Sequence, residues 1–197
     1  MRVVAGELRG RRFDAPPGRD TRPTTDKVRE AVFNALGSLD VVRDAVVVDL
    51  FAGSGGMGIE ALSRGAAEVV FVERDRAALR VLRDNLKALG IDDRARVLQG
   101  DVLIAARGVR ADLVLADPPY GFDAWPALLA AVDAPFVVAE SGGPLDGLDG
   151  LDGPDGLEAS AWRIVRSKRY GRTWVTFFER IEPGIEPGID DGVTSSK

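Results

Sequence analysis

Residues 117–120 read Asp-Pro-Pro-Tyr and follow directly on the apolar run 111–116. Two consecutive prolines stiffen the chain, because each fixes φ near −65° and lacks an N–H donor. A stiff turn at the end of a buried strand presents the Asp117 carboxylate, free backbone carbonyls and the Tyr120 ring where α/β enzymes bind ligands. Acceptors beside a stacking ring suit an amino group on a flat conjugated substrate, whose nitrogen is a poor nucleophile until its hydrogens are drawn out of the ring plane. The alternative is that Pro-Pro only ends a strand and Tyr120 covers the core edge, and the motif alone does not decide between the two.

A second signal is the glycine-rich turn Asp-Leu-Phe-Ala-Gly-Ser-Gly-Gly-Met-Gly at residues 49–58, which follows an apolar run and opens an amphipathic helix. Glycines allow a ligand to approach the backbone closely. Read literally, the glycine spacing also matches the dinucleotide fingerprint, so a dehydrogenase is an alternative. Two observations argue against it. Asp49 would crowd a pyrophosphate but could orient a cationic amino acid group, and the Asp-Pro-Pro-Tyr turn has no role in hydride transfer.

Two further acids follow apolar strands, Glu73 after residues 69–72 and Asp101 after residues 97–100. A carboxylate at the place of Glu73 typically binds ribose hydroxyls, and Asp101 is placed to contact an adenine edge. Alone, each acid could be a solvated strand end or a helix cap. Three acids at the ends of three successive strands, with the proline turn on the fourth, indicate a ligand site at this edge of the sheet.

The elements that must position these residues alternate along the chain. The expected strands are 46–50, 68–73, 94–98, 111–117 and 136–139, and the expected helices are 57–64, 76–89 and 122–132. Such alternation predicts a parallel, doubly wound sheet. Before it, a helix should start near Thr25 with Val28, Val32, Phe33 and Leu36 on its apolar face.

Both ends of the chain differ from this core. Residues 162–166 and 173–178 flank a short turn at 170–171 and predict an antiparallel hairpin on the sheet edge. Residues 1–20 predict a small hairpin closed by Pro-Pro-Gly. We therefore expect an N-terminal arm at 1–22 and one domain at 23–181. We further expect a flexible acidic glycine-rich loop at 142–158 and a disordered tail at 182–197. The loop is too short and wrongly spaced for a calcium-binding repeat, and neither segment has a functional interpretation.

Composition narrows the chemistry. The 197 residues suffice for one sizeable core, and 45% of them are hydrophobic. The chain holds no cysteine and no histidine, which excludes disulfides, thiolate catalysis, histidine bases and the usual zinc sites. No signal peptide or membrane-length apolar run is present, so we expect a cytoplasmic protein.

The net charge of −5 conceals two basic clusters. Residues 140–158 hold six acids and no base, whereas residues 1–29 hold eight bases against four acids and residues 163–172 hold five bases against none. Phosphate contacts need such local patches rather than a basic chain. The candidate phosphate ligands are Arg2, Arg9, Arg11, Arg12, Arg166, Lys168 and Arg169. The alternative for any one of them is a solvated surface side chain.

At this point the sequence resembles a family. The motifs at 49–58, Glu73, Asp101 and 117–120 are similar to the ordered motifs of class I S-adenosylmethionine-dependent methyltransferases that act on exocyclic amino groups. The N-terminal stretches 9–12 and 22–30, with 51–55 and 60–65, resemble the bacterial methyltransferases that modify the N2 amine of guanine 966 in 16S ribosomal RNA. The resemblance covers residues 1 to about 140 and, loosely, the last two strands.

The resemblance implies a Rossmann-like α/β fold with a seven-stranded, mostly parallel sheet, a C-terminal antiparallel hairpin and a small N-terminal β-hairpin extension. It implies S-adenosylmethionine as cofactor and 16S ribosomal RNA as partner, within an assembling small subunit, with no metal, no membrane and a monomeric protein. The implied cofactor-binding residues are Arg22, Thr24, Asp49, Phe51, Ala52, Gly53, Ser54, Gly55, Gly56, Glu73, Arg74, Asp101, Val102 and Asp117. The implied catalytic residues are Asp117, Pro118, Pro119 and Tyr120, with the guanine stacked on Tyr120 and its amine held by Asp117 and the Pro118 carbonyl.

Three rival functions stay open. A DNA adenine or cytosine amino-methyltransferase shares the proline turn, although no target-recognition domain is evident in 197 residues. A protein glutamine methyltransferase normally has Asn at the place of Asp117. A non-catalytic RNA-binding scaffold could keep the same fold.

Overall fold

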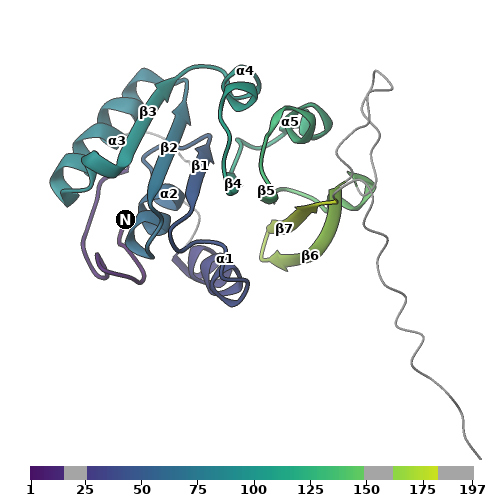
Figure 1. Ribbon diagram of the computed structural model, residues 1–197, viewed down its shortest axis with the longest axis horizontal. Helices are drawn as coiled ribbons and strands as arrows, with labels where there is room; N and C mark the ends of the chain where they lie inside the picture. Colours follow the sequence, from purple (N-terminus) through teal and green to yellow (C-terminus); the bar gives the residue numbers. More distant parts are fainter. Residues whose placement is uncertain (16–25, 149–161, 182–197) are drawn as a thin grey trace, which may run out of the picture.

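The computed structural model of the chain describes residues 1–15, 26–148 and 162–181. These residues form a seven-stranded sheet in the order β3-β2-β1-β4-β5-β7-β6 (Figure 1). The strands are β1 (Val46–Leu50), β2 (Glu68–Glu73), β3 (Ala95–Gln99), β4 (Leu113–Ala116), β5 (Phe136–Ser141), β6 (Trp162–Tyr170) and β7 (Thr173–Arg180). β1 to β5 pair in parallel, and β7 pairs antiparallel with both β5 and β6. The predicted parallel sheet with an antiparallel edge hairpin is confirmed.

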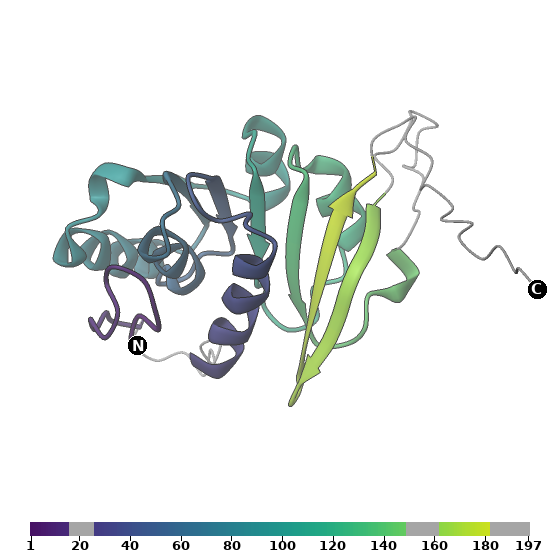
Figure 2. The same cartoon turned by 60° about the horizontal axis from the view of Figure 1, so that its bottom comes forward.

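Helices cover both faces of the sheet (Figure 2). They are α1 (Asp26–Ser38), α2 (Gly56–Ser63), α3 (Arg76–Leu89), α4 (Val102–Ala105) and α5 (Trp125–Ala131). The apolar side chains of α1, α2 and α3 pack on the sheet face of Val47, and those of α4 and α5 pack on the face of Val48. Both valines are at most 2% exposed. The central strands are therefore buried on both sides, which explains why they read as continuous apolar runs.

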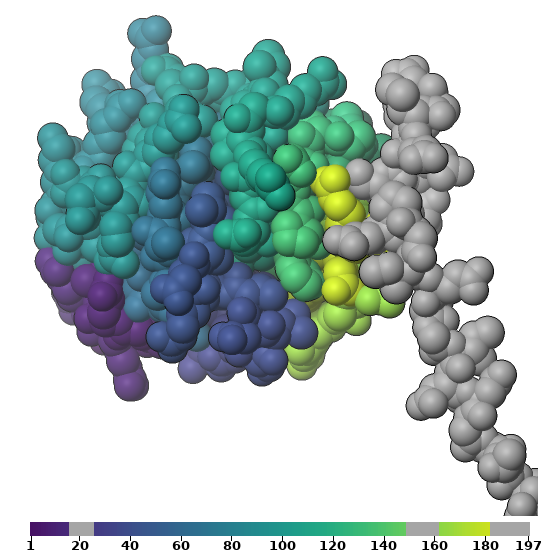
Figure 3. All heavy atoms as spheres, in the orientation of Figure 1, coloured from purple at the N-terminus to yellow at the C-terminus, as the bar shows by residue number. Residues whose placement is uncertain are grey.

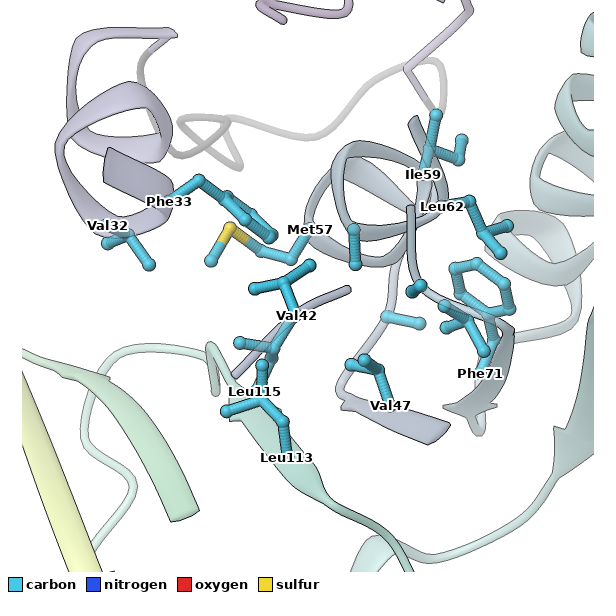
Figure 4. Packing of buried hydrophobic residues seen from close by; sticks show 14 of the residues in the cluster. Val32, Phe33, Val42, Val47, Met57, Ile59, Leu62, Phe71, Leu113 and Leu115 are labelled. Atoms are coloured by element: carbon cyan, nitrogen blue, oxygen red, sulfur yellow. The ribbon is translucent and has the colours of Figure 1, made fainter. Parts of the chain in front are cut away.

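The core beneath α1 positions the glycine-rich turn. Figure 4 shows Phe33 of α1 and Met57 of α2 pointing toward one another above Leu115 of β4, and all three are buried. Gly58 lies so close to β2 that a Cβ atom there would stand 2.2 Å from the Phe71 ring. Any larger residue at 58 would push α2 away from the sheet, so this glycine is required for helix–sheet packing.

The N-terminal arm folds back on the domain rather than standing apart from it. Arg2 and Arg12 form a single antiparallel bridge, so the expected hairpin is present in minimal form. The arm's Val3 and Phe13 are buried in the core cluster. Figure 3 shows the arm lying against the α3 side of the molecule, at the opposite end from the β6–β7 hairpin. The two basic segments of the sequence thus flank the molecule.

Some element boundaries differ from those expected. α5 begins at Trp125 rather than 122, β6 continues to Tyr170 rather than 166, and α4 was not predicted. The expected helix start at Thr25, the tail at 182–197 and most of the acidic loop lie outside the described residues. Within the described ranges, none of the helices combines the length and the apolar character that crossing a bilayer requires.

Candidate active site

Four carboxylates end neighbouring strands on one face of the sheet. Side chains alternate between faces along a strand, and Asp49, Glu73, Asp117 and Glu140 each lie two residues after a side chain of the α1–α3 core cluster, which are Val47, Phe71, Leu115 and Val138. β1 and β4 are neighbours although they are not consecutive in the chain. The strand order therefore reverses there, which is where open α/β sheets bind ligands.

A cleft of about 1780 Å³ lies at these strand ends. All four carboxylates line it, together with the Asp101 side of α4, the start of α1 and the β6–β7 turn. Ligand pockets for one small molecule usually measure about 300–1,000 Å³. This cleft therefore has room for a cofactor and a second group side by side.

Asp49 is the most perturbed acid of the cleft. Its side chain is 2% exposed and accepts a 2.8 Å hydrogen bond from the Gly58 backbone N–H, in the first turn of α2. The pKa of Asp49 is raised to about 7, chiefly by burial and in part by the charges of Asp117 and Glu73, while the Gly58 hydrogen bond lowers it. A positive ligand group nearby would lower this pKa, since an opposite charge favours the ionised carboxylate.

Glu73 holds the glycine-rich turn. Its Oε2 accepts a 2.9 Å hydrogen bond from the Gly53 N–H, and its Oε1 accepts a 2.7 Å hydrogen bond from the Asp75 N–H. Each carboxylate oxygen has a second lone pair, so both can still accept from a ligand hydroxyl. Just before the glycine, Phe51 has a φ of 62°. A bulky residue with positive φ is strained, and such strain clusters at ligand sites.

The proline turn lines the opposite part of the cleft. Asp117 follows β4, and the Tyr120 side chain is 74% exposed, so its ring offers an open face. Phe122 also lines the cleft and makes edge-to-face contacts with Phe51 and Trp125, with ring centroids 5.2 and 5.0 Å apart. The turn therefore brings a carboxylate, backbone carbonyls and an exposed ring to the same cleft.

The remaining expected cofactor residues divide into three groups. Those that line the cleft are Phe51, Ala52, Gly53, Ser54, Gly56, Arg74, Asp101 and Val102. Asp101 also caps α4 by accepting a 2.9 Å hydrogen bond from Leu103. Gly55 faces away from the cleft, because a Cβ there would stand 2.5 Å from Leu82, and its φ of 91° marks the start of α2. Arg22 and Thr24 lie outside the described residues.

The expected RNA-binding residues are exposed, but one of them, Arg11, makes hydrogen bonds within the protein. Arg2, Arg9, Arg12, Arg166, Lys168 and Arg169 lie at the surface. Arg11 instead donates hydrogen bonds of 2.8 and 2.6 Å to the carbonyls of Leu89 and Ala88, at the end of α3. A cation there stabilises the helix C-terminus. Arg11 therefore fastens the arm to the domain, a role that the sequence did not indicate.

Sequence reasoning missed two features of the cleft. Glu140 lines it from β5 and is 5% exposed, although the sequence counted this acid only as part of an acidic segment. The signal was available, because Glu140 ends an apolar strand as Asp49 and Glu73 do. The turn at residues 170–173 also lines the cleft, and Arg172 stands on it. Its position follows from the pairing of Ser141 with Trp174, which no local pattern encodes.

The chain matches the family described as Conserved hypothetical protein 95 over residues 1–179. It belongs to that family. It is 42% identical over 148 residues to YlbH of Bacillus subtilis (strain 168), whose name describes a candidate rRNA methyltransferase, and the match covers 72% of this chain and 79% of that protein. It is also 42% identical over 122 residues to ribosomal RNA small subunit methyltransferase D of Escherichia coli (strain K12), with 61% of this chain and 60% of that protein covered.

A solved structure extends the likeness to most of the fold. The structure of yhhF from Escherichia coli, described as a candidate methyltransferase, superposes with a TM-score of 0.75 at 33% identity. The superposition covers 91% of this chain and 97% of that one. The likeness therefore extends over nearly the whole fold of both proteins.

Proposed function

We propose that this protein transfers the methyl group of S-adenosylmethionine to the N2 amine of a guanine in small-subunit ribosomal RNA. The observation that carries the proposal is that the Asp-Pro-Pro-Tyr turn lines the same cleft as the glycine-rich turn and the acids of β1 and β2. The names of the relatives support the reaction and the RNA class.

The charge of the cleft favours this cofactor over a dinucleotide. Asp49, Glu73, Asp101 and Asp117 all line the space in which a cofactor would lie. A pyrophosphate would face this concentration of carboxylates, whereas a sulfonium and an ammonium group are attracted to it. Glu73 would accept from ribose hydroxyls, Asp101 from the adenine amine, and Asp49 would face the cationic amino acid end.

The proline turn supplies the means to activate the amine. When bound, S-adenosylmethionine carries a methyl group that is open to attack by a nucleophile in line with the carbon–sulfur bond. The Asp117 carboxylate and the Pro118 carbonyl would accept the two N2 hydrogens and so aim the nitrogen lone pair at that carbon. Tyr120 would stack on the extruded guanine, as enzymes that act on a base require. As the nitrogen–carbon bond forms, the carbon–sulfur bond would break to leave a neutral thioether, and Asp117 or water would take the proton that the amine releases.

The substrate would be held by basic segments on both sides of the cleft. Arg9 and Arg12 on the arm, and Arg166, Lys168 and Arg169 on β6, are exposed and suited to phosphate contacts. We further propose that the protein acts as a monomer in the cytoplasm, without a metal, on 16S ribosomal RNA within an assembling subunit.

The direct test is methyl transfer in vitro from isotope-labelled S-adenosylmethionine to small-subunit RNA or particles, followed by nucleoside analysis. Wild type should form N2-methylguanosine. Asp117→Ala should form none yet keep most of its affinity for the cofactor, because the main role of Asp117 is to hold the amine. Asp93→Ala is the matched control, since this exposed acid lies between α3 and β3, outside the cleft. Cofactor binding without transfer to any RNA would contradict the proposal and favour a scaffold, and transfer to DNA would favour the DNA rival.

A further inference from the structure

Glu140 stands beside the group that would hold the target amine. β4 and β5 pair in parallel with Ala116 opposite Ala139, so Asp117 and Glu140 each follow the last residue that pairs between these two strands. Both line the cleft, and each stands two residues after a side chain of the α1–α3 core cluster, Leu115 and Val138, so strand alternation directs them to the same side of the sheet. Neighbouring strands are about 4.8 Å apart. The two carboxylates are therefore adjacent across one strand spacing.

Glu140 is also fixed in place. Its side chain is 5% exposed, at the end of a strand that is paired on both sides, with β4 and with β7. Opposite Glu140 on β7 stands Val175, which is fully buried. A carboxylate has two oxygens with about four acceptor sites, so Glu140 can accept from a ligand while it keeps its interactions within the protein. A carboxylate so held can act as a selective acceptor.

The chemistry of the bases determines which donor fits. In guanine the exocyclic amine on C2 is next to a ring N–H at N1. In adenine and in cytosine the amine is next to a ring nitrogen that only accepts, and uracil has no amine. A carboxylate only accepts hydrogen bonds. An acceptor for the amine with a second acceptor beside it therefore matches guanine alone among the four RNA bases.

We infer that Glu140 accepts the N1–H of the target guanine and thereby determines which base is methylated. The inference rests on the proposed function, since it assumes that Asp117 and Pro118 hold the amine. Glu140 takes no part in forming the new bond. It acts by orienting the correct base and by repelling the N1 lone pair of adenine or the equivalent N3 lone pair of cytosine.

The test exchanges the donor for an acceptor on the base. RNA is prepared with 2,6-diaminopurine at the target position, which keeps the C2 amine but carries a lone pair at N1. Wild type should prefer guanine by at least about 10-fold in kcat/KM, the scale of losing a hydrogen bond to a charged group. In Glu140→Gln the side-chain amide can donate to that lone pair. The preference for guanine should then fall by about 10-fold or more, while the affinity for S-adenosylmethionine stays at the wild-type value.

Two controls separate the possible failures. Glu68→Gln changes an exposed glutamate at the start of β2, the end of the strand away from the cleft. This variant should keep the wild-type preference for guanine over 2,6-diaminopurine. If wild type methylates guanine N2 but Glu140→Gln keeps the full preference for guanine, the inference is wrong and the proposed function stands. If wild type methylates no guanine, the proposed function itself fails.

A second measurement does not depend on the variant being folded. Wild type is given RNA with 2-aminopurine at the target, which has the C2 amine and no N1–H. Methylation of this base at least about 10-fold more slowly than guanine supports the inference. Equal rates for the two bases would overturn it.

Discussion

Asp49→Asn should stabilise the free protein at alkaline pH and remove a pH dependence from its unfolding. An aspartate ionises near 3.8 in the unfolded chain and near 7 in this fold, so between these values the folded state holds the extra proton. Stability therefore falls as pH rises through this window. A difference of about three pKa units, at about 1.4 kcal/mol each, corresponds to about 4 kcal/mol at pH 8. Asn keeps an oxygen that can accept from Gly58, and it carries no charge.

The assay is urea unfolding of wild type and Asp49→Asn at pH 5, 6, 7 and 8. The contributions of other acids cancel in the difference between the two proteins. The free energies of unfolding should be closest at pH 5, and the variant should gain about 3 kcal/mol relative to wild type between pH 5 and pH 8, because about two of the three pKa units lie in this range. Parallel curves over this range would refute the account of a buried acid kept partly protonated. The same substitution should weaken S-adenosylmethionine binding. In wild type the affinity for this cation should rise between pH 6 and 8 as Asp49 ionises, and in Asp49→Asn this rise should be absent.

Substitutions of Glu73, of Tyr120 and of the arginines of the arm test other parts of the account. Glu73→Ala should weaken the binding of S-adenosylmethionine, measured by calorimetry, by about 1–3 kcal/mol, the scale of hydrogen bonds to a charged group. Unchanged affinity would exclude Glu73 from the cofactor site. Tyr120→Ala should lose stacking of about 1–3 kcal/mol in RNA affinity while Tyr120→Phe retains most activity, unless the hydroxyl has a role of its own. Replacing Arg9 and Arg12 by Gln should reduce the slope of RNA affinity against salt concentration by the equivalent of up to about two phosphate contacts. The melting temperature should stay at the wild-type value. Arg11→Ala should instead lower the free energy of unfolding by about 1–3 kcal/mol and leave the salt dependence unchanged. If Arg11→Ala changed only the salt dependence, and the Arg9 and Arg12 variant changed only the stability, the roles assigned to these arginines would be wrong.

The sequence predicted the centre of the fold well, because its signals there are local. β1 and β2 are short apolar runs that end in acids, and both were placed within their observed bounds. α4 was missed because it is four residues long and has no room for a helical period. α5 was expected from 122 but begins at Trp125, and the Phe122 ring before it packs between Phe51 and Trp125, a contact that no local pattern encodes.

Other features of the site depend on contacts between distant residues. The glycine pattern could not reveal that Gly55 faces Leu82 while its neighbours line the cleft. Arg11 was expected at phosphates together with the rest of its cluster, but it reaches carbonyls 77 and 78 residues away. Glu140 was counted only among the acids of residues 140–158, because its neighbour Asp117 is adjacent only through strand pairing. Such neighbours require the register of the sheet.

The central claim is tested most directly by mapping the modified nucleosides of 16S ribosomal RNA in cells that lack this gene. Mass spectrometry should detect the loss of one N2-methylguanosine from these cells. Expression of the wild-type chain should restore it, and expression of Asp117→Ala should not. Loss of a different modification, or an unchanged set of modified guanines in the absence of the protein, would contradict the account.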